Sequence, residues 1–457
     1  MNVAEQIVNQ LVDAGVHRIY GIVGDSLNPI VDAVRKTGGS KKGGIDWIHV
    51  RHEEAAAFAA SAESQLTGKL AVCAGSCGPG NLHLINGLYD ANRTGAPVLA
   101  IASHIPSVQI GTTYFQETHP DRIFEECSVY NELISSAAQS PRTVNSAIRH
   151  AVGLGGVSVI TLPGDISDLK AVEHVPTYAP ARPATLAPNA TDIEEAAALL
   201  NKADKVAIFA GAGVEGAHDE VIALADALKA PIGHSLRGKH FIQYDNPFDV
   251  GMTGLLGYGA AAEGMNDADV LILLGTDFPY DQFLPSTPTI QVDTHAEKLG
   301  RRTDVGLAIH AQVKPFIEAL LPHLRTNRSD SFLKSKIKKH SEIMHAPVGA
   351  YTRNVEKMRP IHPEYAAHLL NETAATDAIF TADTGMCNVW TARYIDPLGT
   401  RRLIGSLLHG SMANALPMAL GAQVAYPGRQ VVSVSGDGGL SMLLGELITA
   451  KMYDLPV

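Results

Sequence analysis

The stretch VVSVSGDGG at residues 431–439 decides how this chain is expected to fold and what it can bind. Its apolar start predicts a buried strand, and its glycines predict a tight turn that opens a helix. Such a turn can bind a divalent cation through the carboxylate of Asp437 and a diphosphate through the backbone N–H groups of Gly438 and Gly439. Because most Asp-Gly pairs are only turns, the motif gains meaning from the rest of the chain.

Short apolar runs typical of buried parallel strands recur along the chain. Helical patterns lie between them, as at residues 3–14 and 53–66, and Asn28-Pro29 predicts the N-cap and first residue of another helix. This alternation predicts an α/β protein with doubly wound parallel sheets. The expected strands lie at residues 18–23, 70–74, 98–103, 157–162, 206–210, 270–274, 289–292, 378–382 and 430–434.

Changes in composition divide the 457 residues into three predicted domains. Residues 171–190 have the proline-rich composition of a linker, and residues 326–360 form a charged connector without clear core strands. We therefore expect domains at residues 1–180, 181–330 and 331–457. The linker prolines are Pro176, Pro180, Pro183 and Pro188.

The charge and the cysteine content exclude several classes of protein. A formal net charge of −11 and a pI near 5.9 argue against nucleic acid as a partner. The basic cluster at residues 334–339 is interpreted as a solvated helix face. The cysteines Cys73, Cys77, Cys127 and Cys387 fit neither a disulfide framework nor zinc-site spacing, so we expect buried, reduced thiols.

The hydropathy pattern predicts a cytoplasmic protein. No apolar run reaches the length that spans a membrane, and the first residues form an amphipathic helical pattern instead of a signal peptide. Membrane contact is therefore expected only through a segment beyond residue 457.

Three further motifs share the chain with the glycine turn, namely RHEEAAA at residues 51–57, GPGN at 78–81 and HGSMA at 409–413. Together the four motifs resemble the thiamine diphosphate (ThDP) enzymes of the pyruvate oxidase group, and within it the flavin-dependent pyruvate:quinone oxidoreductases. The resemblance runs from residue 1 to residue 457 and implies ThDP, Mg²⁺ and FAD as cofactors. It stops where the family continues with an asparagine and a backbone carbonyl that bind Mg²⁺, so we expect these residues alone to be inactive.

Glu53 is the candidate catalytic residue. In the family, a glutamate directly after the position of His52 shares a proton with the aminopyrimidine of ThDP and so promotes proton loss from the thiazolium C2. A glutamate at the start of an alanine-rich helix suits this role, because burial keeps its proton available. The plainer interpretation is a glutamate that only stabilises the first turn of a helix, and Glu54 is the neighbouring alternative.

The resemblance assigns further ThDP contacts to two glycine turns. Pro79 and Gly80 would lie against the pyrimidine ring, and Asp437 would bind Mg²⁺ while Gly438 and Gly439 present amides to the diphosphate. The alternative for both turns is a plain strand-to-helix connection, in which glycine serves only the backbone.

The HGSMA motif supplies the contact to the amino group of the cofactor. By the resemblance, the carbonyl group of Gly410 holds the 4′-amino group, Ser411 also binds the cofactor, and Met412 forces the cofactor into a V shape that brings this group to C2. A methionine has the bulk and the adaptable shape for this task, although a methionine in an Ala- and Leu-rich segment more often packs in a core.

The middle block points to a flavin. GAGVEG at residues 211–216 matches GxGxxG, but the acidic ribose partner of a nicotinamide site, expected about twenty residues on, is replaced by PIG at 231–233. The resemblance instead implies FAD extended across this block, with Asp293 accepting from ribose hydroxyls; a block without cofactor is the alternative. The predicted FAD residues are Gly211, Gly213, Arg237, Gly238, Thr253, Gly254, Leu255, Leu256, Thr276, Asp277, Phe278, Pro279, Tyr280 and Asp293.

The segment FQETHP at residues 115–120 resembles the substrate-side loop of pyruvate oxidases. Phe115 and Gln116 would then wall the pocket around a small 2-oxo acid. The alternative is a surface loop held by an aromatic anchor.

The resemblance implies oxidative decarboxylation of pyruvate to acetate and CO₂, with electron transfer through FAD to a membrane quinone. It also implies a homotetramer of dimers, in which each ThDP site takes Glu53 from one subunit and Asp437 from its neighbour. The alternatives are a phosphate-dependent pyruvate oxidase that uses O₂, an acetolactate synthase-like carboligase, and a fragment that folds without turnover.

Overall fold

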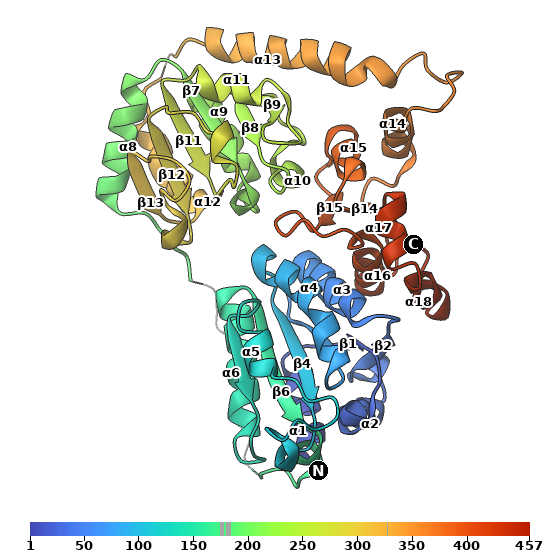
Figure 1. The fold of residues 1–457 in the computed structure, drawn as a ribbon. Helices are drawn as coiled ribbons and strands as arrows, with labels where there is room; N and C mark the ends of the chain where they lie inside the picture. The colour runs from blue at the N-terminus through green and yellow to red at the C-terminus, as the bar shows by residue number, and fades with distance from the viewer. Residues whose placement is uncertain (174–177, 180–183, 327) are drawn as a thin grey trace. The chain divides into compact units, whose positions relative to one another are not determined.

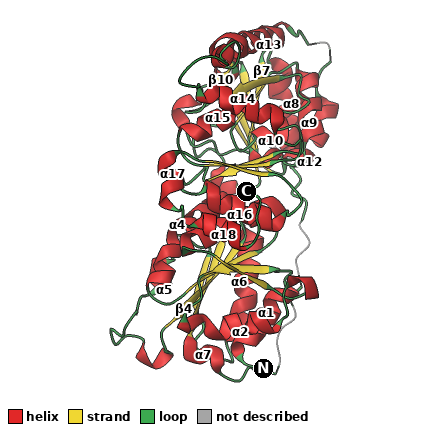
Figure 2. Cartoon of the chain, turned by 90° about the vertical axis from the view of Figure 1, so that its right-hand side faces the viewer, coloured by secondary structure: helices red, strands yellow, loops and turns green. Residues whose placement is uncertain are grey.

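A computed structural model describes residues 1–173, 178–179, 184–326 and 328–457 of the chain. These residues form three sheets with helices packed on them (Figure 1; Figure 2). The chain divides into two compact units, and each is described by itself. The first unit comprises Met1–Arg182, Ala378–Asn388 and Ile404–Val457, and the second comprises Pro183–Asp377 and Val389–Leu403.

The first sheet has six parallel strands in the order β2-β1-β3-β4-β6-β5. Its strands are β1 (Arg18–Gly21), β2 (Asp46–His49), β3 (Ala71–Gly75), β4 (Val98–His104), β5 (Tyr130–Leu133) and β6 (Val157–Pro163). Its helices are α1 (Val3–Asp13), α2 (Asn28–Lys36), α3 (Glu53–Thr67), α4 (Pro79–Thr94), α5 (Pro120–Ile123), α6 (Ser140–Leu154) and α7 (Gly164–Asp168).

Helices cover both faces of this sheet. Val72 and Ala74 of β3 share a core with α1, α2 and α6, whereas Ala71 and Cys73 share a core with α3 and α4. Successive residues of a strand point to opposite faces, so a strand buried on both faces must be apolar throughout. This is why unbroken apolar runs predict the doubly wound sheet.

The second unit contains a seven-stranded sheet in the order β10-β9-β8-β7-β11-β12-β13. All neighbours are parallel except β9 and β10. Its strands are β7 (Val206–Ala210), β8 (Ile232–His234), β9 (Asp249–Met252), β10 (Tyr258–Gly259), β11 (Val270–Leu274), β12 (Thr289–Asp293) and β13 (Leu307–His310). Its helices are α8 (Ala190–Lys202), α9 (His218–Leu228), α10 (Lys239–Ile242), α11 (Ala261–Asn266), α12 (Val313–Leu320), α13 (Ser331–Ile343) and α14 (Pro363–Thr373).

The third sheet has the order β15-β14-β16, and β14 and β16 are parallel. Its strands are β14 (Ile379–Ala382), β15 (Arg402–Gly405) and β16 (Val431–Val434), and the remaining helices are α15 (Met386–Tyr394), α16 (Ala415–Ala425), α17 (Asp437–Met442) and α18 (Glu446–Met452). With three sheets built largely from parallel strands, the chain has the α/β architecture that the sequence predicts.

Helix α3 is rich in alanine because two other helices approach its backbone closely. A Cβ on Gly87 of α4 would fall 2.5 Å from the Cβ of Ala57, and a Cβ on Gly421 of α16 would overlap the carbonyl oxygen of Ala59. Larger side chains at these positions would push the helices apart. The apolar surroundings of Glu53, the first residue of α3, therefore arise from helix packing on two sides.

Two expectations about local structure are wrong. Helix α2 begins at Asn28 and its cap position is Leu27, because a 3₁₀ turn at Asp25–Leu27 leads directly into the helix. The basic cluster at residues 334–339 is not a wholly solvated face either. Lys336 of α13 is buried, and its ammonium group forms ion pairs with Glu263 at 2.6 Å and Asp267 at 2.5 Å.

The second unit also differs in extent from the expected middle domain. It includes residues 331–377, because α13 packs on it through the Lys336 ion pairs, so the expected boundary at residue 331 falls inside the unit. The expected boundary at residue 180 and the linker prolines Pro176, Pro180 and Pro183 lie outside the described residues.

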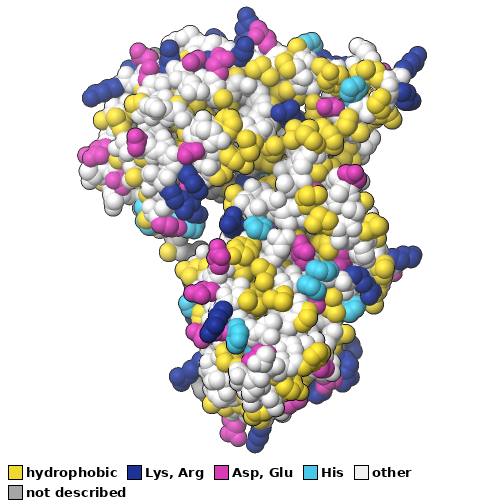
Figure 3. Space-filling model, in the orientation of Figure 1, with side chains coloured by type: hydrophobic (Ala, Val, Ile, Leu, Met, Phe, Trp, Pro, Cys, Tyr) yellow, Lys and Arg dark blue, Asp and Glu magenta, His cyan; other side chains and the backbone are white. Residues whose placement is uncertain are grey.

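Other bulk expectations can be compared directly with the structure. The four cysteines are buried and free of disulfides, as the sequence predicts. None of the described helices is long and apolar enough to cross a membrane. Lys and Arg side chains are scattered among acidic ones over the face drawn in Figure 3.

Candidate functional site

The candidate ThDP residues of the N-terminal sheet follow three of its parallel strands. Glu53 comes after β2, Pro79 and Gly80 come after β3, and Phe115 and Gln116 come after β4. Because the strands run in the same direction, these segments leave the sheet at its carboxyl edge, where open α/β sheets bind their ligands. The structure thus brings segments far apart in the sequence to one edge.

Glu53 lies in a buried position that faces α4. Only 6% of the residue is exposed, and its Oε2 lies 2.9 Å from Nδ1 of His83. A Cβ on Gly80 would fall 3.0 Å from Oε1 of Glu53 and 3.3 Å from Cβ of Ser76, so glycine allows the turn to pack closely against the carboxylate. A buried carboxyl group next to an imidazole can pass a proton to it or take one from it, which is the chemistry of general acid–base catalysis.

His52 completes a group of three possible metal ligands, but the geometry does not suit a metal ion. Ligand atoms of His52, Glu53 and His83 lie within 4.8 Å of one another, and the two imidazole rings stack with centroids 4.4 Å apart at an angle of 25°. A bound metal lies near the plane of each imidazole, about 2.0–2.1 Å from nitrogen for zinc. Two nearly parallel planes do not meet so close to the rings, so the group suits proton exchange better than metal binding.

The substrate-side loop lies against the glycine turn that follows β3. A Cβ on Gly78 would fall 2.9 Å from the Cβ of Gln116, and the thiol of Cys77 donates to Oε1 of Gln116 at 3.3 Å. Gln116 has a φ of 61°, a left-handed conformation that non-glycine residues rarely adopt outside functional loops and tight turns. Phe115 is 78% exposed. Of the two predicted residues, the structure therefore places Gln116 at the turn and leaves Phe115 at the surface.

Asn86 of α4 connects the HGSMA loop to α3. Its Nδ2 donates to Oγ of Ser411 at 2.8 Å and to Oε1 of Glu54 at 2.7 Å, and its Oδ1 lies 2.9 Å from Nε2 of His409. Glu54 is thus paired with an amide, whereas Glu53 is paired with the imidazole of His83, a group that can exchange a proton.

The HGSMA loop also lies beside the GDGG turn. A Cβ on Gly438 would fall 3.1 Å from Cε of Met412. Gly410 has a φ of 78°, and nothing lies within 4 Å of where its Cβ would be. Met412 and Asp437 are both exposed. The two segments therefore present an open backbone and two accessible side chains next to each other.

Asp383 is a site residue that the sequence analysis missed. It directly follows β14, is 1% exposed, and accepts through Oδ1 from Nδ2 of Asn414 at 3.1 Å and from the amide of Ala415 at 3.0 Å. Burial raises the pKa of Asp383, and the hydrogen bonds from Ala415 and its neighbours oppose this shift. A Cβ on Gly439 would overlap its Oδ2, so Asp383 explains why the last position of the turn is glycine.

The predicted flavin residues of the second unit also gather at one edge of one sheet. They follow β7, β8, β9, β11 and β12, which are neighbouring strands that all run in the same direction. The carboxyl edge of the sheet therefore carries Gly211, Arg237, Thr253, Thr276 and Asp293 in five adjacent loops. An extended ligand such as a dinucleotide suits such an edge.

The glycines of this edge pack against each other. A Cβ on Gly213 would fall 2.6 Å from Cα of Gly275, and a Cβ on Gly211 would overlap the carbonyl oxygen of Gly275. Gly254, with a φ of 100°, lies against the ring of Phe278. The first two glycines of the GxGxxG match are therefore accounted for by contact between two loops of the same chain, and the third, Gly216, by its left-handed φ of 74°.

The carboxylates of this edge already have partners. Asp277 forms ion pairs with Arg301 and, at 3.5 Å, with Arg302. Oδ1 of Asp293 accepts from the amide of His295 at 2.9 Å. A ribose hydroxyl that donates to Asp293 would have to share its carboxylate with His295.

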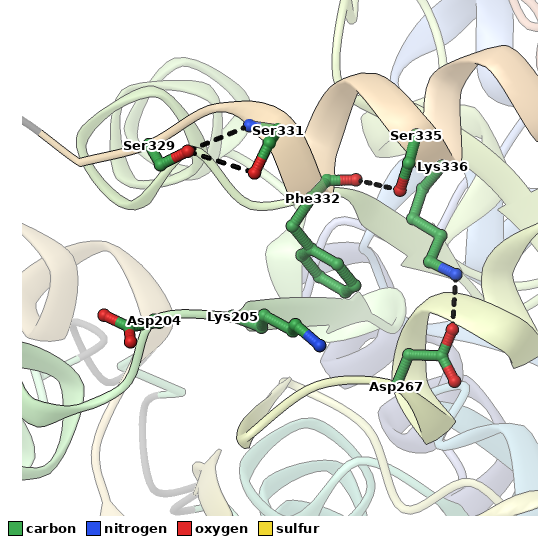
Figure 4. Close-up of a pocket in the computed structure, with 8 residues that line it drawn as sticks. All are labelled: Asp204, Lys205, Asp267, Ser329, Ser331, Phe332, Ser335 and Lys336. Carbon is green, nitrogen blue, oxygen red and sulfur yellow. Dashed lines mark hydrogen bonds and ion pairs between the residues drawn. The ribbon is translucent and has the colours of Figure 1, made fainter.

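A cavity of about 360 Å³ in the second unit lies apart from all predicted site residues (Figure 4). The ammonium of Lys336 on its wall is held by Asp267 and Glu263, and none of the predicted site residues lines the cavity. It is lined by Asp204, Lys205, Asp267, Ser329, Ser331, Phe332, Ser335 and Lys336.

Three side chains with direct site contacts escaped the sequence analysis. His83 and Asn86 stand three and six residues after Gly80 on α4, a spacing that places them along one helix face toward the start of α3. Asp383 follows the strand β14 as Asp437 follows the adjacent strand β16. In the sequence, each of these residues is only a polar residue that follows a motif or a strand. Its contact with a neighbouring element shows that it belongs to the site.

Comparison with known proteins shows the family of the chain. Three domains of the thiamine pyrophosphate enzymes match the chain, thiamine pyrophosphate being another name for ThDP. The N-terminal TPP binding domain matches residues 1–123, the central domain matches residues 193–320, and the C-terminal TPP binding domain matches residues 383–457.

Relatives extend the match over nearly the whole chain. An uncharacterized 42.6 kDa protein of Pseudomonas amyloderamosa is 53% identical over 72% of this chain and 83% of its own length. The putative thiamine pyrophosphate-containing protein YdaP of Bacillus subtilis is 36% identical over 99% of this chain and 78% of its own. Pyruvate oxidase of Lactiplantibacillus plantarum is 30% identical over 99% of this chain and 75% of its own. Acetolactate synthases are also among the relatives. The chain therefore belongs to the thiamine pyrophosphate enzyme family.

Proposed function

We propose that this chain acts in the oxidative decarboxylation of pyruvate to acetate and CO₂, with ThDP, Mg²⁺ and FAD as cofactors and a membrane quinone as electron acceptor. Pyruvate and water give acetate, CO₂, two protons and two electrons, and the electrons pass through the flavin to the quinone. The observation that carries the proposal is the 2.9 Å contact between the buried Glu53 carboxylate and His83, with the Gly80 turn packed beside it and Gln116 on the adjoining turn. A ring nitrogen placed there meets a carboxyl group that can exchange its proton.

The residues of the first unit have distinct tasks in this proposal. Bound ThDP supplies a carbon nucleophile and an electron sink for the loss of CO₂. Glu53 holds the proton that the aminopyrimidine exchanges, and His83 keeps the Glu53 carboxyl oriented through its 2.9 Å contact. Gln116 and Phe115 border the substrate, and the Gly80 turn excludes any side chain from the face of the ring.

The GDGG turn holds the other end of the cofactor in this proposal. Asp437 binds Mg²⁺ through its exposed carboxylate, and the amides of Gly438 and Gly439 bind the diphosphate. Gly410 would hold the amino group of the cofactor, and Ser411 and Met412 would contact the cofactor beside it. The position of Met412 beside Gly438 supports this arrangement, because one ligand can then touch both segments.

The experiment that tests the proposal is a turnover assay on purified protein with pyruvate, ThDP, Mg²⁺ and an artificial two-electron acceptor. The proposal expects a yellow protein that releases FAD on denaturation, whose flavin bleaches when pyruvate is added, and whose product is acetate. A colourless protein that still consumes pyruvate refutes the flavin part and leaves a simple decarboxylase.

Two other functions are favoured by the names of relatives. Similarity to pyruvate oxidase supports a phosphate-dependent oxidase that makes acetyl phosphate and reduces O₂. Similarity to acetolactate synthases supports a carboligase in which any flavin is structural. Product analysis with and without phosphate identifies the first, and acetolactate formation without flavin bleaching identifies the second.

We also propose that the active site forms between two subunits of a homo-oligomer, a tetramer of two dimers, that contacts the membrane surface to reach quinone. Large apolar side chains are exposed on α17, α18 and the turn between them, and such patches mark association surfaces. They are Leu440, Met442, Leu444, Leu447, Ile448 and Met452.

Mixed subunits test the shared site. When Glu53→Gln and Asp437→Ala chains are co-expressed, a mixed dimer has one site with both defects and one intact site. About a quarter of wild-type activity should then return, since about half the dimers are mixed and half their sites are intact. Activity that stays at the level of the single variants refutes the shared site.

A further inference from the structure

Helix α18 holds the connection that leads into Glu53. Glu446, its first residue, is 1% exposed, and its Oε1 accepts from the amide of Arg51 at 2.8 Å and from the amide of His52 at 3.0 Å. Its Oε2 accepts from the hydroxyl of Thr449 at 2.7 Å. A buried carboxylate is thus fully occupied by groups next to the catalytic candidate.

The two amides are the last ones before Glu53. His52 is the N-cap of α3 and has an extended backbone, with a φ of −148° and a ψ of 138°. Amide groups at a helix start have no acceptor within the helix and need one from elsewhere. Glu446 supplies that acceptor for two successive residues, so it fixes the peptide planes from which the Glu53 side chain departs.

A second side chain beyond α18 acts on the same connection. The hydroxyl of Tyr453 accepts from the amide of His49 at 2.7 Å and lies 3.2 Å from the carbonyl oxygen of Trp47, to which it can donate. Residues 47–52 are therefore held at four backbone groups by Glu446 and Tyr453. Such a density of side-chain bonds to the end of β2 and the turn that follows it indicates that the next residue, Glu53, must be placed accurately.

We propose that Glu446 is a positioning residue for Glu53, which acts by fixing the Arg51–His52 backbone and touches neither cofactor nor substrate. The inference rests on the proposed role of Glu53 in proton exchange with ThDP. Catalytic groups must be held within fractions of an ångström, and a displacement of about 1 Å can cost roughly 100-fold in rate. The assignment therefore predicts a loss of cofactor activation when the acceptor is removed.

The contact geometry separates the hydrogen bonds from the charge. Both amides donate to the same oxygen, Oε1, so the amide oxygen of Glu446→Gln can accept both bonds while its NH₂ group donates to the Thr449 hydroxyl. Glu446→Ala removes the acceptor altogether. Glu125→Ala, at an exposed carboxylate of the same unit, is the matched control.

The test uses the full-length protein with saturating ThDP and Mg²⁺. Amide hydrogen exchange of the peptide that contains Arg51 and His52 measures how firmly Glu446 holds these two amides. Deuterium exchange at C2 of ThDP measures the activation of the cofactor. Glu446→Ala should speed exchange of these amides and slow C2 exchange by roughly 10- to 100-fold. The dissociation constant of ThDP and the KM for pyruvate should change little, while kcat falls with C2 exchange. Glu446→Gln and Glu125→Ala should resemble the wild type in all five measurements.

Several results overturn the assignment. C2 exchange at the wild-type rate in Glu446→Ala refutes it, and so does an equal loss in Glu446→Gln, since charge and not the acceptor would then matter. If Glu446→Ala does not fold, Tyr453→Phe decides, because it loses only the bonds to Trp47 and His49. It should slow C2 exchange less but measurably, and faster amide exchange with an unchanged C2 rate refutes the assignment. A wild-type protein without ThDP-dependent C2 exchange refutes the proposed function instead, and the amide measurement still reports whether Glu446 holds the connection.

Discussion

Gly80 and Gly213 are both glycines that the sequence places in ligand-binding turns, yet their surroundings differ. At Gly80 an added Cβ would fall 3.0 Å from the Glu53 carboxylate and 3.3 Å from the side chain of Ser76, at the edge of the first sheet. At Gly213 an added Cβ would fall 2.6 Å from Cα of Gly275. The first glycine therefore packs against side chains that include the candidate catalytic residue, the second packs against the backbone of another loop, and only the neighbours distinguish the two cases.

The polar groups of the two edges differ in the same way. Glu53 contacts the imidazole of His83, with which it can exchange a proton, and the buried Gly80 turn packs against its carboxylate. Asp277 in the second unit forms ion pairs with two arginines, Arg301 and Arg302. The carboxylate of the first edge therefore faces a group that can exchange its proton, whereas the carboxylate of the second edge is paired with fixed positive charges of the same unit. A cofactor at the second edge must therefore bind on a preformed surface.

The largest expected effect concerns Glu53. The variant Glu53→Gln keeps the shape of the side chain but cannot pass a proton, so C2 exchange of bound ThDP should fall by roughly 100-fold or more. The fold should persist, because glutamine also fits the position next to His83. NMR-detected deuterium exchange at C2 measures the effect. Glu54→Gln, whose partner is Asn86, should lose far less, and a larger loss in Glu54→Gln would reverse our assignment.

The fold was predictable where burial alone decides the structure. The expected strands at residues 206–210 and 270–274 coincide with β7 and β11, which are buried on both faces and therefore apolar at every position. Strand β5 escaped the analysis because it lies at the sheet edge with a partly exposed YNEL sequence. The prediction that Asn28 is an N-cap was wrong. An asparagine can cap a helix or can continue a preceding 3₁₀ turn into it, and only the backbone angles distinguish the two cases.

The site was predictable only where a motif is continuous in the sequence. Glu53 and Gly80 belong to such motifs, and the structure brings them together. His83, Asn86 and Glu446 act through contacts between elements that lie up to several hundred residues apart in the chain. Nothing local marks a glutamate in an amphipathic helix as the acceptor for two distant amides, so tertiary packing alone defines these roles.

The buried Lys239 makes the stability of the second unit depend on pH. Its ammonium group is buried and donates to the carbonyl of Ala392, and burial lowers its pKa from 10.5 to about 8, against the opposing effect of Asp396 and Asp249. Below pH 8 the folded state holds a buried charge that burial destabilises. As the pH rises from about 8 to 10.5, the folded protein releases the proton first, so the free energy of unfolding rises.

Lys239→Met removes this titration. Between neutral pH and pH 10.5, the wild type should gain about 3 kcal/mol of unfolding free energy relative to Lys239→Met, with the gain beginning near pH 8. Urea unfolding of both proteins across this range measures the difference. A constant difference would mean that the amine reaches water in the folded state.

Two glycine substitutions compare a glycine that packs against another loop with a glycine of the GDGG turn. Gly213→Ala should destabilise the protein by about 1–3 kcal/mol, because its Cβ meets the backbone of Gly275. Gly436→Ala should change stability by less than about 0.5 kcal/mol, since its φ of −76° suits alanine and nothing lies within 4 Å of the new methyl group. The same methyl group should weaken ThDP binding on the order of tenfold, about 1.4 kcal/mol. Thermal unfolding and ThDP titration with Mg²⁺ measure the pair, and unchanged ThDP affinity in Gly436→Ala would remove the GDGG turn from the cofactor site.

The smallest expected effect concerns the flavin edge. Asp293 ends β12 and already accepts from the amide of His295, so it has one free oxygen to offer a ribose hydroxyl. Asp293→Asn keeps the acceptor for His295 but removes the charge. A hydrogen bond to a charged group is worth roughly 1 kcal/mol more than one between neutral groups. The affinity for FAD should therefore fall by roughly three- to tenfold, with stability unchanged. Titration of FAD into deflavinated protein, followed by flavin fluorescence, measures it, and Asp304→Asn at an exposed position before β13 is the control. Equal affinity in both variants would show that Asp293 stabilises only the His295 turn and does not contact FAD.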